Sequence, residues 1–244
     1  MIVERLEKPT AAERLREPLE AALSLLRRQR MLRLRPWKGF GEPFNGQATR
    51  RRTVDLLVRE FSPETLIETG TFLGFSTRCL AGYGAHTYTV EVSPRFRYAA
   101  QFALRNLNNV TMIWGDSAAA VRHLAQRAEV TRPLAYLDAH WEEDVPLDAE
   151  LECLFSSWDE VLVVIDDFRV PGEPGYGYDI YNGIPLSLDE LSLPEGVTVA
   201  YPAIAAVEET GSRRGTIYLA SGDSARSALD AAEREGLVSI QRDG

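Results

Sequence analysis

Five short apolar runs in this chain each end at or beside an acidic residue. The acids, in chain order, are Glu68, Glu91, Asp116, Asp138 and the pair Asp166 and Asp167. If the runs are strands of one parallel sheet, the acids meet at one edge, because the carboxyl ends of parallel strands lie together there and ligands bind there. The sequence therefore predicts a polar pocket built from strand ends.

The first of these runs leads into a glycine-rich turn. The segment 65–76 reads Thr-Leu-Ile-Glu-Thr-Gly-Thr-Phe-Leu-Gly-Phe-Ser, which predicts a strand, a tight turn and a helix start. Free N–H groups at a helix start favour an anion. A dinucleotide site would need glycine where Phe72 stands, so the spacing favours a smaller anion, such as the carboxylate of a methionyl group; a purely structural turn is the alternative. The residues predicted to bind this part of a ligand are Glu68, Gly70, Gly74 and Ser76.

The next two acids suit a nucleoside. Glu91 follows Glu68 by 23 residues, and a carboxylate at that strand end can accept hydrogen bonds from both hydroxyls of a ribose. Asp116 closes the third run, where its side chain can accept from an adenine amino group. Ser117 can bond a ring nitrogen or, equally, cap the helix that follows.

The last three acids suit a cation. Asp138 ends the fourth run, and Asp166 and Asp167 end the fifth. Adjacent strands lie about 5 Å apart, so three carboxylates there would repel one another unless they shared a proton or a cation. Oxygen ligands of this kind suit Mg²⁺ or a similar divalent ion. The alternative is that the two strands are not neighbours or that Asp167 faces solvent.

Strands and helices alternate from residue 64 onward, which predicts an α/β, Rossmann-like, doubly wound and mostly parallel sheet. Two late runs without a long helix between them predict an antiparallel closing pair. The predicted strands are 65–69, 87–91, 110–114, 134–138, 161–166, 197–201 and 215–220. The predicted helices are 11–34, 48–60, 75–83, 95–107, 117–128, 147–157 and 223–235, and Pro18 is placed in the first turn of the first of them.

We divide the chain into a helical N-terminal extension with a covering loop, residues 1–47, and a main domain, residues 48–244. Arginines crowd the end of the extension helix; they form a solvated basic face, a surface for a homo-oligomer partner or a contact for an anionic substrate. The loop 36–47 carries Trp37, Phe40 and Phe44, which either cover a ligand or fix the extension to the core.

Composition excludes several classes of protein. Residues 1–60 hold 14 Lys and Arg against 8 Asp and Glu, a net +6, and the rest hold 13 against 28, a net −15. An acidic main body argues against a nucleic-acid partner. The two cysteines, Cys79 and Cys153, form no spaced framework. The first ten residues are charged and no run of about 20 apolar residues occurs, so we expect a soluble cytoplasmic protein without a membrane partner.

Five motifs together resemble the catechol O-methyltransferase-like branch of the class I S-adenosylmethionine (SAM)-dependent methyltransferases. They are Glu-Thr-Gly-Thr-Phe-Leu-Gly-Phe-Ser, Thr-Val-Glu-Val-Ser-Pro, Val-Thr-Met-Ile-Trp-Gly-Asp-Ser, Leu-Asp-Ala-His-Trp and Ile-Asp-Asp-Phe-Arg-Val-Pro-Gly, in order over about residues 60 to 172. The doubled aspartate is also similar to macrocin-type sugar O-methyltransferases. The resemblance implies SAM as cofactor and Asp138, Asp166 and Asp167 as ligands of the ion.

The catechol-type enzymes carry a lysine base just after the fourth-strand aspartate, and this chain departs from them there. Its only lysines are Lys8 and Lys38, and Trp141 stands near the expected position. His140 is the best replacement, because an imidazole can take a proton near neutral pH; the alternative is a histidine that only bonds a carboxylate or the cofactor. The predicted catalytic residues are therefore His140 and Asp138.

The resemblance implies a SAM-dependent, Mg²⁺-dependent O-methyltransferase acting on a hydroxyl of a small molecule such as a sugar, an aromatic or a natural product. Aromatic residues in the loop 171–183 would meet that substrate or merely form a long connection. The alternatives are a metal-independent methyltransferase with another acceptor, a non-catalytic partner-binding module, and a nicotinamide-dependent dehydrogenase, which Phe72 disfavours.

Overall fold

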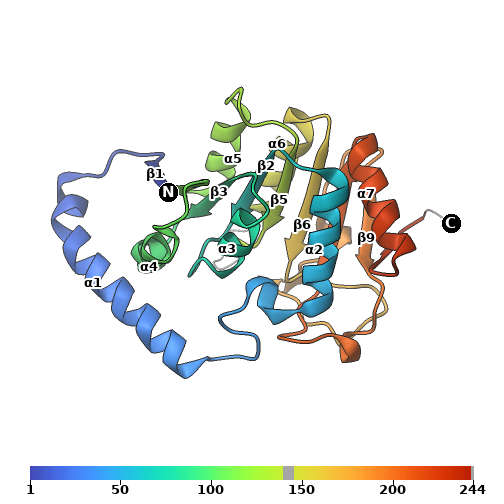
Figure 1. The fold of residues 1–244 in the computed structure, drawn as a ribbon, viewed down its shortest axis with the longest axis horizontal. Helices are drawn as coiled ribbons and strands as arrows, with labels where there is room; N and C mark the ends of the chain where they lie inside the picture. The colour runs from blue at the N-terminus through green and yellow to red at the C-terminus, as the bar shows by residue number, and fades with distance from the viewer. Residues whose placement is uncertain (140–145, 243–244) are drawn as a thin grey trace.

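A computed structural model of the chain describes residues 1–139 and 146–242. Within that part, nine strands form one sheet in the order β1-β4-β3-β2-β5-β6-β10-β9-β11 (Figure 1). The parallel strands are β1 (Ile2–Arg5), β2 (Thr65–Thr69), β3 (His86–Glu91), β4 (Val110–Trp114), β5 (Pro133–Leu137) and β6 (Val161–Asp166). The antiparallel strands are β10 (Thr216–Ser221), β9 (Thr198–Pro202) and β11 (Val238–Ile240). The predicted fold is confirmed, including the antiparallel closing pair.

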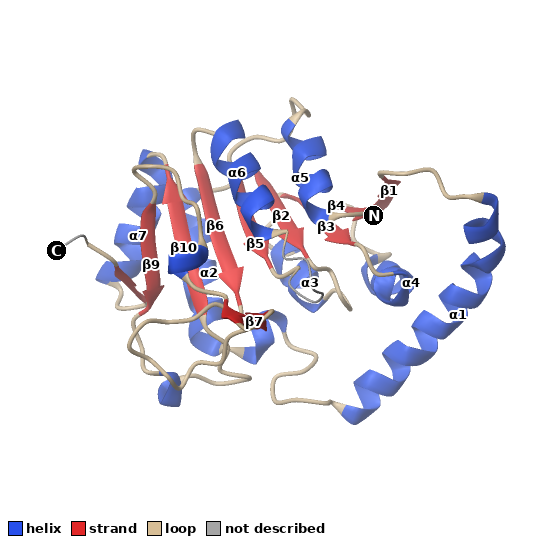
Figure 2. Ribbon diagram, turned by 180° about the vertical axis from the view of Figure 1, so that it is seen from behind, coloured by secondary structure: helices blue, strands red, loops and turns tan. Residues whose placement is uncertain are grey.

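Helices cover both faces of the sheet (Figure 2). They are α1 (Ala11–Leu34), α2 (Ala48–Phe61), α3 (Phe75–Ala81), α4 (Pro94–Leu104), α5 (Ser117–Ala125), α6 (Leu147–Ser157) and α7 (Asp223–Arg234). Alternate residues of a strand point to opposite faces: Val163 of β6 packs in the cluster that contains α5 and α6 side chains, and Leu162 and Val164 pack with α2, α3 and α7. A central strand therefore needs to be apolar on both faces, as the run Val161–Asp166 is until its last residue.

Three 3₁₀ turns and a small hairpin connect the larger elements. The turns are η1 (Pro43–Gly46), η2 (Leu188–Glu190) and η3 (Ala206–Glu208), and the hairpin pairs β7 (Ile180–Tyr181) with β8 (Ile184–Pro185). Within the described residues, no helix is both long enough and apolar enough to cross a bilayer.

The first ten residues are more ordered than their composition predicts. Residues 2–5 form β1, which extends the sheet beside β4. Thr10 and Glu13 then form a capping box in which each side chain accepts a hydrogen bond from the other residue's backbone N–H. The helix therefore begins at Ala11 and Pro18 lies in its interior, so the placement of Pro18 in the first turn is wrong.

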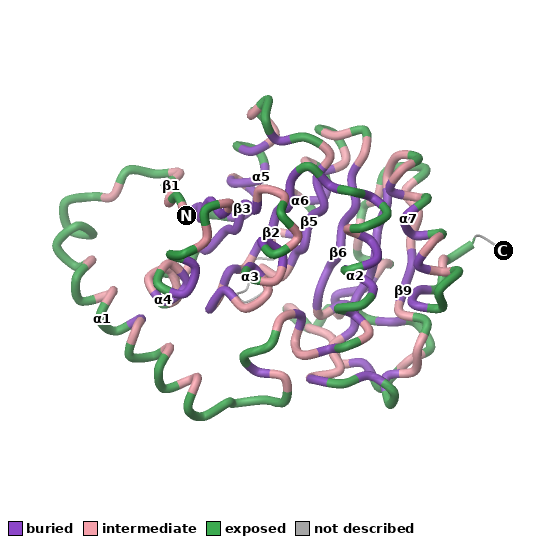
Figure 3. The backbone as a smooth tube through the Cα atoms, viewed as in Figure 1, coloured by how far each residue is buried: buried purple, intermediate pink, exposed green. Residues whose placement is uncertain are grey.

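Helix α1 stands at the side of the molecule and packs along α4 (Figure 1). Ser24 is fully buried there, and its Oγ accepts a hydrogen bond from the backbone N–H of Ala99 at 3.0 Å. The other side of the helix is open: Leu15 and Leu19 are 84% and 63% exposed, and most of the helix is coloured as exposed in Figure 3. Only one face of α1 thus contributes to the core.

The loop 36–47 is fixed to the body rather than suspended over it. Phe44 is fully buried, and its ring lies 5.1 Å from that of Tyr136 on β5. The N-terminus of α2, which follows, is capped from far along the chain: the Glu209 carboxylate accepts from the backbone N–H groups of Thr49 and Arg50 at 3.1 and 3.2 Å. An anion at a helix start is favourable, so this contact fixes the first turn of α2 next to the strand ends.

Candidate active site

The turn between β2 and α3 depends on both of its glycines. Gly70 has a φ of +84°, and a Cβ there would collide with the backbone carbonyl of Asp138. Gly74 has a φ of +78° and begins α3, where a Cβ would lie 3.0 Å from Leu104 of α4. The tight packing of Gly70 therefore brings the ends of β2 and β5 together, a role that the sequence alone did not indicate.

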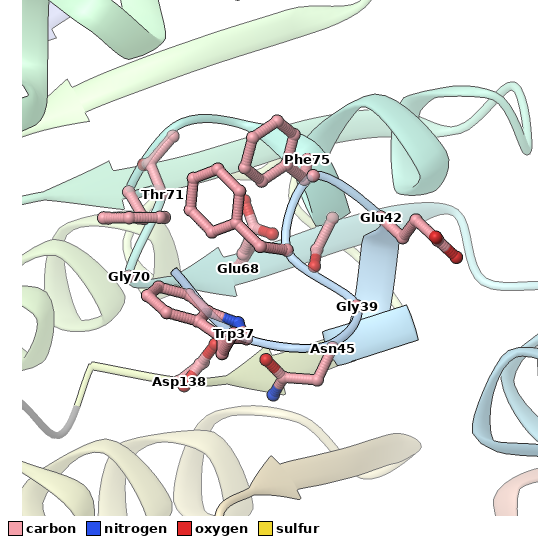
Figure 4. A pocket seen from close by; sticks show the side chains of 13 residues that line it. Trp37, Gly39, Glu42, Asn45, Glu68, Gly70, Thr71, Phe75 and Asp138 are labelled. Carbon is pink, nitrogen blue, oxygen red and sulfur yellow. The ribbon is translucent and has the colours of Figure 1, made fainter. Parts of the chain in front are cut away.

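Glu68 lies at the base of a small pocket of about 60 Å³ between this turn and the loop 36–47 (Figure 4). Its Oε2 accepts hydrogen bonds from the hydroxyls of Thr77 and Thr89, the latter at 2.6 Å. Burial raises the pKa of Glu68 to about 7 although these bonds oppose the shift. Ser76 lines the same pocket, and its Oγ accepts from the backbone N–H of Phe44 at 3.1 Å. Gly74 is not among the described residues that line it.

Backbone N–H groups of the β2–α3 turn and of the residues after β3 hold the Glu91 carboxylate. Its two oxygens accept from the backbone N–H groups of Phe72 and Ser93, both at 2.8 Å. Burial raises the pKa of Glu91 to about 7, against the effect of both bonds. The carboxyl group is thereby fixed in one orientation at the wall of a larger cleft.

Asp116 caps α5, because its Oδ1 accepts from the backbone N–H of Ala119 at 2.7 Å. The capping role considered for Ser117 therefore belongs to Asp116, and Ser117 is the first residue of the helix. Ser117 is buried near Glu150 of α6. Burial raises the pKa of Glu150 to about 7. Both Asp116 and Ser117 line the cleft.

The cleft has a volume of about 1050 Å³ and follows the carboxyl ends of the strands. One end is formed by the β4–α5 turn and Glu91, and the other by Asp138, Asp167 and Asn45. Met31, at the end of α1, and Trp37, in the loop after it, also line the cleft. Figure 4 shows Trp37 and Asn45 on the side of the smaller pocket that faces Asp138. Trp37 thus lines both pockets, whereas Phe40 and Phe44 are buried and fix the loop to the body. That the loop covers a ligand stays a prediction.

Asp138 and Asp167 face the acidic end of the cleft. Burial, and then the charges of Asp166 and Asp167, raise the pKa of Asp138 well above its usual range. Burial and Asp166 raise the pKa of Asp167 to about 7, against the lowering effect of Arg214. Arg214 Nε donates to Asp167 Oδ1 at 2.5 Å, and its Nη2 pairs with Asp179.

Asp166 does not face the cleft. It is 1% exposed and forms an ion pair with Arg50 of α2, which is also buried. Its Oδ2 accepts from the Tyr136 hydroxyl at 2.6 Å and from Asn45 Nδ2 at 3.1 Å, and its Oδ1 also accepts from the backbone N–H of Asp167 at 2.7 Å. Strands β5 and β6 are neighbours, as predicted, but the acid at the end of β6 is turned into the protein.

The predicted Mg²⁺ ligands therefore do not fit a shared cation. Within residues 1–139 and 146–242, no group of three or more His, Cys, Asp or Glu side chains is arranged to hold a metal ion. Asp138 and Asp167 lie at the cleft and Asp166 lies behind it, paired with a guanidinium group. Of the predicted catalytic residues, Asp138 lines the cleft, and His140 lies outside the described residues.

Asn45, Arg50 and Arg214 were not among the residues predicted from the sequence. No signal distinguishes Arg50 from the arginines beside it, because an arginine in the first turn of a helix usually faces solvent. The loop 171–183 was predicted either to meet a substrate or to form a long connection. Its Tyr176 is buried and donates from its hydroxyl to the carbonyl of Ile204 at 3.3 Å. That tyrosine is structural.

Known proteins share the sequence in part and the fold more widely. No protein-family model matches the chain. A segment of 132 residues is 28% identical to catechol O-methyltransferase of Mus musculus, over 50% of this chain and 49% of the relative. The chain thus spans about half the length of that curated relative.

Solved structures align over most of the chain. A putative O-methyltransferase from Klebsiella pneumoniae superposes with a TM-score of 0.54 at 18% identity, over 86% of this chain and 95% of its own. The O-methyltransferase from Bacillus cereus in complex with S-adenosylhomocysteine (SAH) gives 0.52 at 16%, over 88% and 93%. The chain has the fold of the O-methyltransferases. A third, TomG from Streptomyces achromogenes in complex with SAM, gives 0.54 at 15%, over 89% and 92%, and the predicted resemblance is confirmed at the level of fold.

Proposed function

We propose that this protein is a SAM-dependent O-methyltransferase that acts on a hydroxyl group of a small molecule. One observation carries the proposal: a single cleft along the carboxyl ends of the strands joins Glu91, Asp116 and Ser117 at one end to Asp138 and Asp167 at the other. Ligands of open α/β sheets bind at this edge, and the neighbours of known structure that hold SAM or SAH share the fold.

The residues of the cleft suit the three parts of SAM. Glu91 is oriented by two backbone N–H groups and would accept hydrogen bonds from the ribose hydroxyls. Asp116 and Ser117 would contact the adenine. The Gly70 turn and Ser76 would meet the methionyl carboxylate in the small pocket. Glu68 lies at the base of that pocket. When bound, SAM supplies a methyl group on a positively charged sulfur, which becomes a neutral thioether once the methyl carbon bonds to an acceptor oxygen.

The acceptor would lie at the acidic end of the cleft. Carboxyl groups of Asp138 and Asp167 can accept hydrogen bonds from substrate hydroxyls and so orient the attacking oxygen, which is the main contribution that a protein makes to such a transfer. Trp37 and Phe72, whose ring centroids are 6.3 Å apart, would pack against a sugar or aromatic ring. We assign removal of the acceptor proton to a side chain: Asp138, in its ionised form, is the candidate among the described residues, and His140 lies outside them.

Binding experiments test this proposal directly. We expect SAM and SAH, but not NAD, to raise the melting temperature of the purified protein and to bind with one-to-one stoichiometry in calorimetry. Glu91→Gln removes the charge that pairs with the ribose, and a hydrogen bond to a charged group contributes about 1.5–3 kcal/mol, so the Kd for SAH should rise about 10- to 150-fold.

Glu152→Gln is the matched control, since Glu152 is an exposed glutamate on α6 outside the cleft, and it should leave the Kd unchanged. Equal affinity of the Glu91→Gln and Glu152→Gln variants would refute the assignment of Glu91. A protein that binds neither SAM nor SAH would instead favour the non-catalytic module. A panel of hydroxylated and aminated acceptors, assayed by the SAH they release, separates oxygen from nitrogen transfer.

A further inference from the structure

Arg50 is a positive charge buried behind the acidic end of the cleft. Its side chain is 2% exposed and extends from the first turn of α2 toward the ends of β5, β6 and β10. Nη1 pairs with Asp166 Oδ1 and lies 3.3 Å from the Tyr136 hydroxyl. Nη2 donates to the backbone carbonyls of Arg214 and Gly215, the latter at 3.2 Å. Every one of these partners belongs to the sheet or to the turn that leads into β10.

Asp166 has no acceptor capacity left for a metal ion. An ionised carboxylate offers about four lone-pair sites, and Asp166 accepts four hydrogen bonds. The donors are Arg50 Nη1, the Tyr136 hydroxyl, Asn45 Nδ2 and the backbone N–H of Asp167. A divalent ion at Asp166 would have to displace some of these donors and would meet a guanidinium group already paired with the same carboxylate.

Hydrogen bonds from distant parts of the chain fix the backbone around Arg50. Its backbone N–H is bonded to the buried carboxylate of Glu209, which also holds Thr49 and so fixes the first turn of α2. Gln47, at the start of the same helix, binds both the N–H and the carbonyl of Arg214, at 2.7 and 3.0 Å. The guanidinium group is thus attached to a helical turn that these hydrogen bonds hold in place.

The second acid of the pair has its own cation. Asp167 has a left-handed backbone, with a φ of 55°, which turns its side chain away from Asp166 toward the cleft. There Arg214 pairs with it and with Asp179. Two arginines, one from α2 and one from the turn before β10, therefore pair separately with the two neighbouring aspartates.

We propose that Arg50 is the resident cation of this active site and takes the place that a divalent ion would need, so that methyl transfer here requires no metal. Arg50 is a positioning residue: it holds Asp166, and through it Tyr136 and Asn45, behind the acceptor end of the cleft. The statement about turnover rests on the proposed function; the statement about metal binding does not.

Metal titration of the whole, unaltered protein tests the inference. Mn²⁺ is titrated against the protein with and without SAH and followed by electron paramagnetic resonance, and melting temperatures are compared in EDTA and in 5 mM Mg²⁺. We expect no saturable one-to-one Mn²⁺ binding below 1 mM and melting temperatures that agree within 1 °C. One-to-one binding below 100 µM that weakens at least tenfold in Asp138→Asn, Asp166→Asn or Asp167→Asn would overturn the inference.

Turnover provides the second measurement. The rate in EDTA should lie within twofold of the rate in Mg²⁺, and loss of turnover in EDTA that Mg²⁺ restores would overturn the inference. At a temperature where circular dichroism shows a folded protein, Arg50→Gln should lower kcat at least tenfold, Mg²⁺ should not restore it, and Arg50→Lys should restore it in part. Full turnover of folded Arg50→Gln would show that the charge has no place in the reaction. If SAH fails to bind, the proposed function fails, while the Mn²⁺ titration still reports on the cation site.

Discussion

Replacing Asp166 by asparagine should destabilise the protein far more than an isosteric change usually does. The variant keeps the shape of the side chain but removes the negative charge opposite Arg50, and both groups are almost fully buried at 2% and 1% exposure. Burial opposes the charge on Arg50, but Asp166 and the nearby tyrosines raise its pKa above its ordinary value. An arginine is not deprotonated in proteins, so the guanidinium group stays charged in the variant and loses the carboxylate with which it pairs.

The magnitude follows from that unpaired charge. Removing one partner of a buried ion pair costs about 3–5 kcal/mol of unfolding free energy. In a protein of this length 1 kcal/mol corresponds to about 2–4 °C, so the melting temperature of Asp166→Asn should fall by about 6–20 °C. Arg50→Met should cost a similar amount, because Asp166 is then buried without its cation.

A double-mutant cycle separates the ion pair from simple loss of packing. Urea unfolding of the wild type, Asp166→Asn, Arg50→Met and the double variant, followed by tryptophan fluorescence, should give a double variant that is about 2–3 kcal/mol less destabilised than the sum of the single changes. The control is Glu4→Gln, which breaks the pair of Glu4 with Arg127 at 2.9 Å, where the side chains are 29% and 26% exposed. That change should cost less than about 1 kcal/mol.

Two results would refute this reasoning. One is a cost for Asp166→Asn no larger than that for Glu4→Gln, which would mean that water or another group compensates Arg50. The other is additivity of the two single changes, which would show that Arg50 and Asp166 contribute independently of each other.

Further predictions concern pH, the glycine turn and α1. Glu68 and Glu91 have pKa values raised to about 7 from 4.5, so the stability that they contribute is full below pH 4.5 and is lost as the pH rises through 7. The melting temperature of the cofactor-free protein should therefore fall over that range. If the melting temperature of Glu68→Gln depended on pH as steeply as that of the wild type, the prediction would be contradicted. Gly70→Ala places a Cβ against a backbone carbonyl at a positive φ and should lower the yield of folded protein and abolish SAH binding; wild-type behaviour in both would contradict the geometry. Homo-oligomer formation through α1 remains a prediction that its exposed leucines support. Light scattering should show an oligomeric wild type and a smaller species for Leu19→Glu with Leu26→Glu, and a monomeric wild type would contradict the prediction.

The sequence was sufficient for the strands and helices of the central sheet. The run Val161–Asp166 is apolar up to its last residue because both of its faces are covered, and the turn at Gly70 has glycines where the backbone needs positive φ. By contrast, residues 2–5 contain two charged side chains and form the edge strand of the sheet, beside β4, so no local pattern marks them as β1. Pro18 resembles a first-turn proline until the capping box at Thr10 and Glu13 is recognised.

The sequence predicted where the acids of the site lie, but not which groups pair with them. Periodicity places Asp138 and Asp166 at the ends of adjacent strands, and it is correct there. It gives no information about what approaches those ends from elsewhere in the chain. Arg50 comes from 116 residues before Asp166, and Arg214 comes from 47 residues after Asp167. Three carboxylates at neighbouring strand ends indicate that positive charge is needed, but they do not indicate whether a metal ion or arginine supplies it.

The segment before residue 48 also contributes residues to the cleft that its local sequence pattern does not reveal. Its composition suggests an accessory loop, and the boundary at residue 47 stays a prediction. Yet Asn45 donates to Asp166, Trp37 lines the cleft and Phe44 is fully buried beside Tyr136. Asn45, in the turn before α2, and Arg50, in the first turn of α2, bind the same carboxylate. A displacement of this loop that removed Asn45 would therefore take one hydrogen bond from Asp166, the acid that pairs with Arg50.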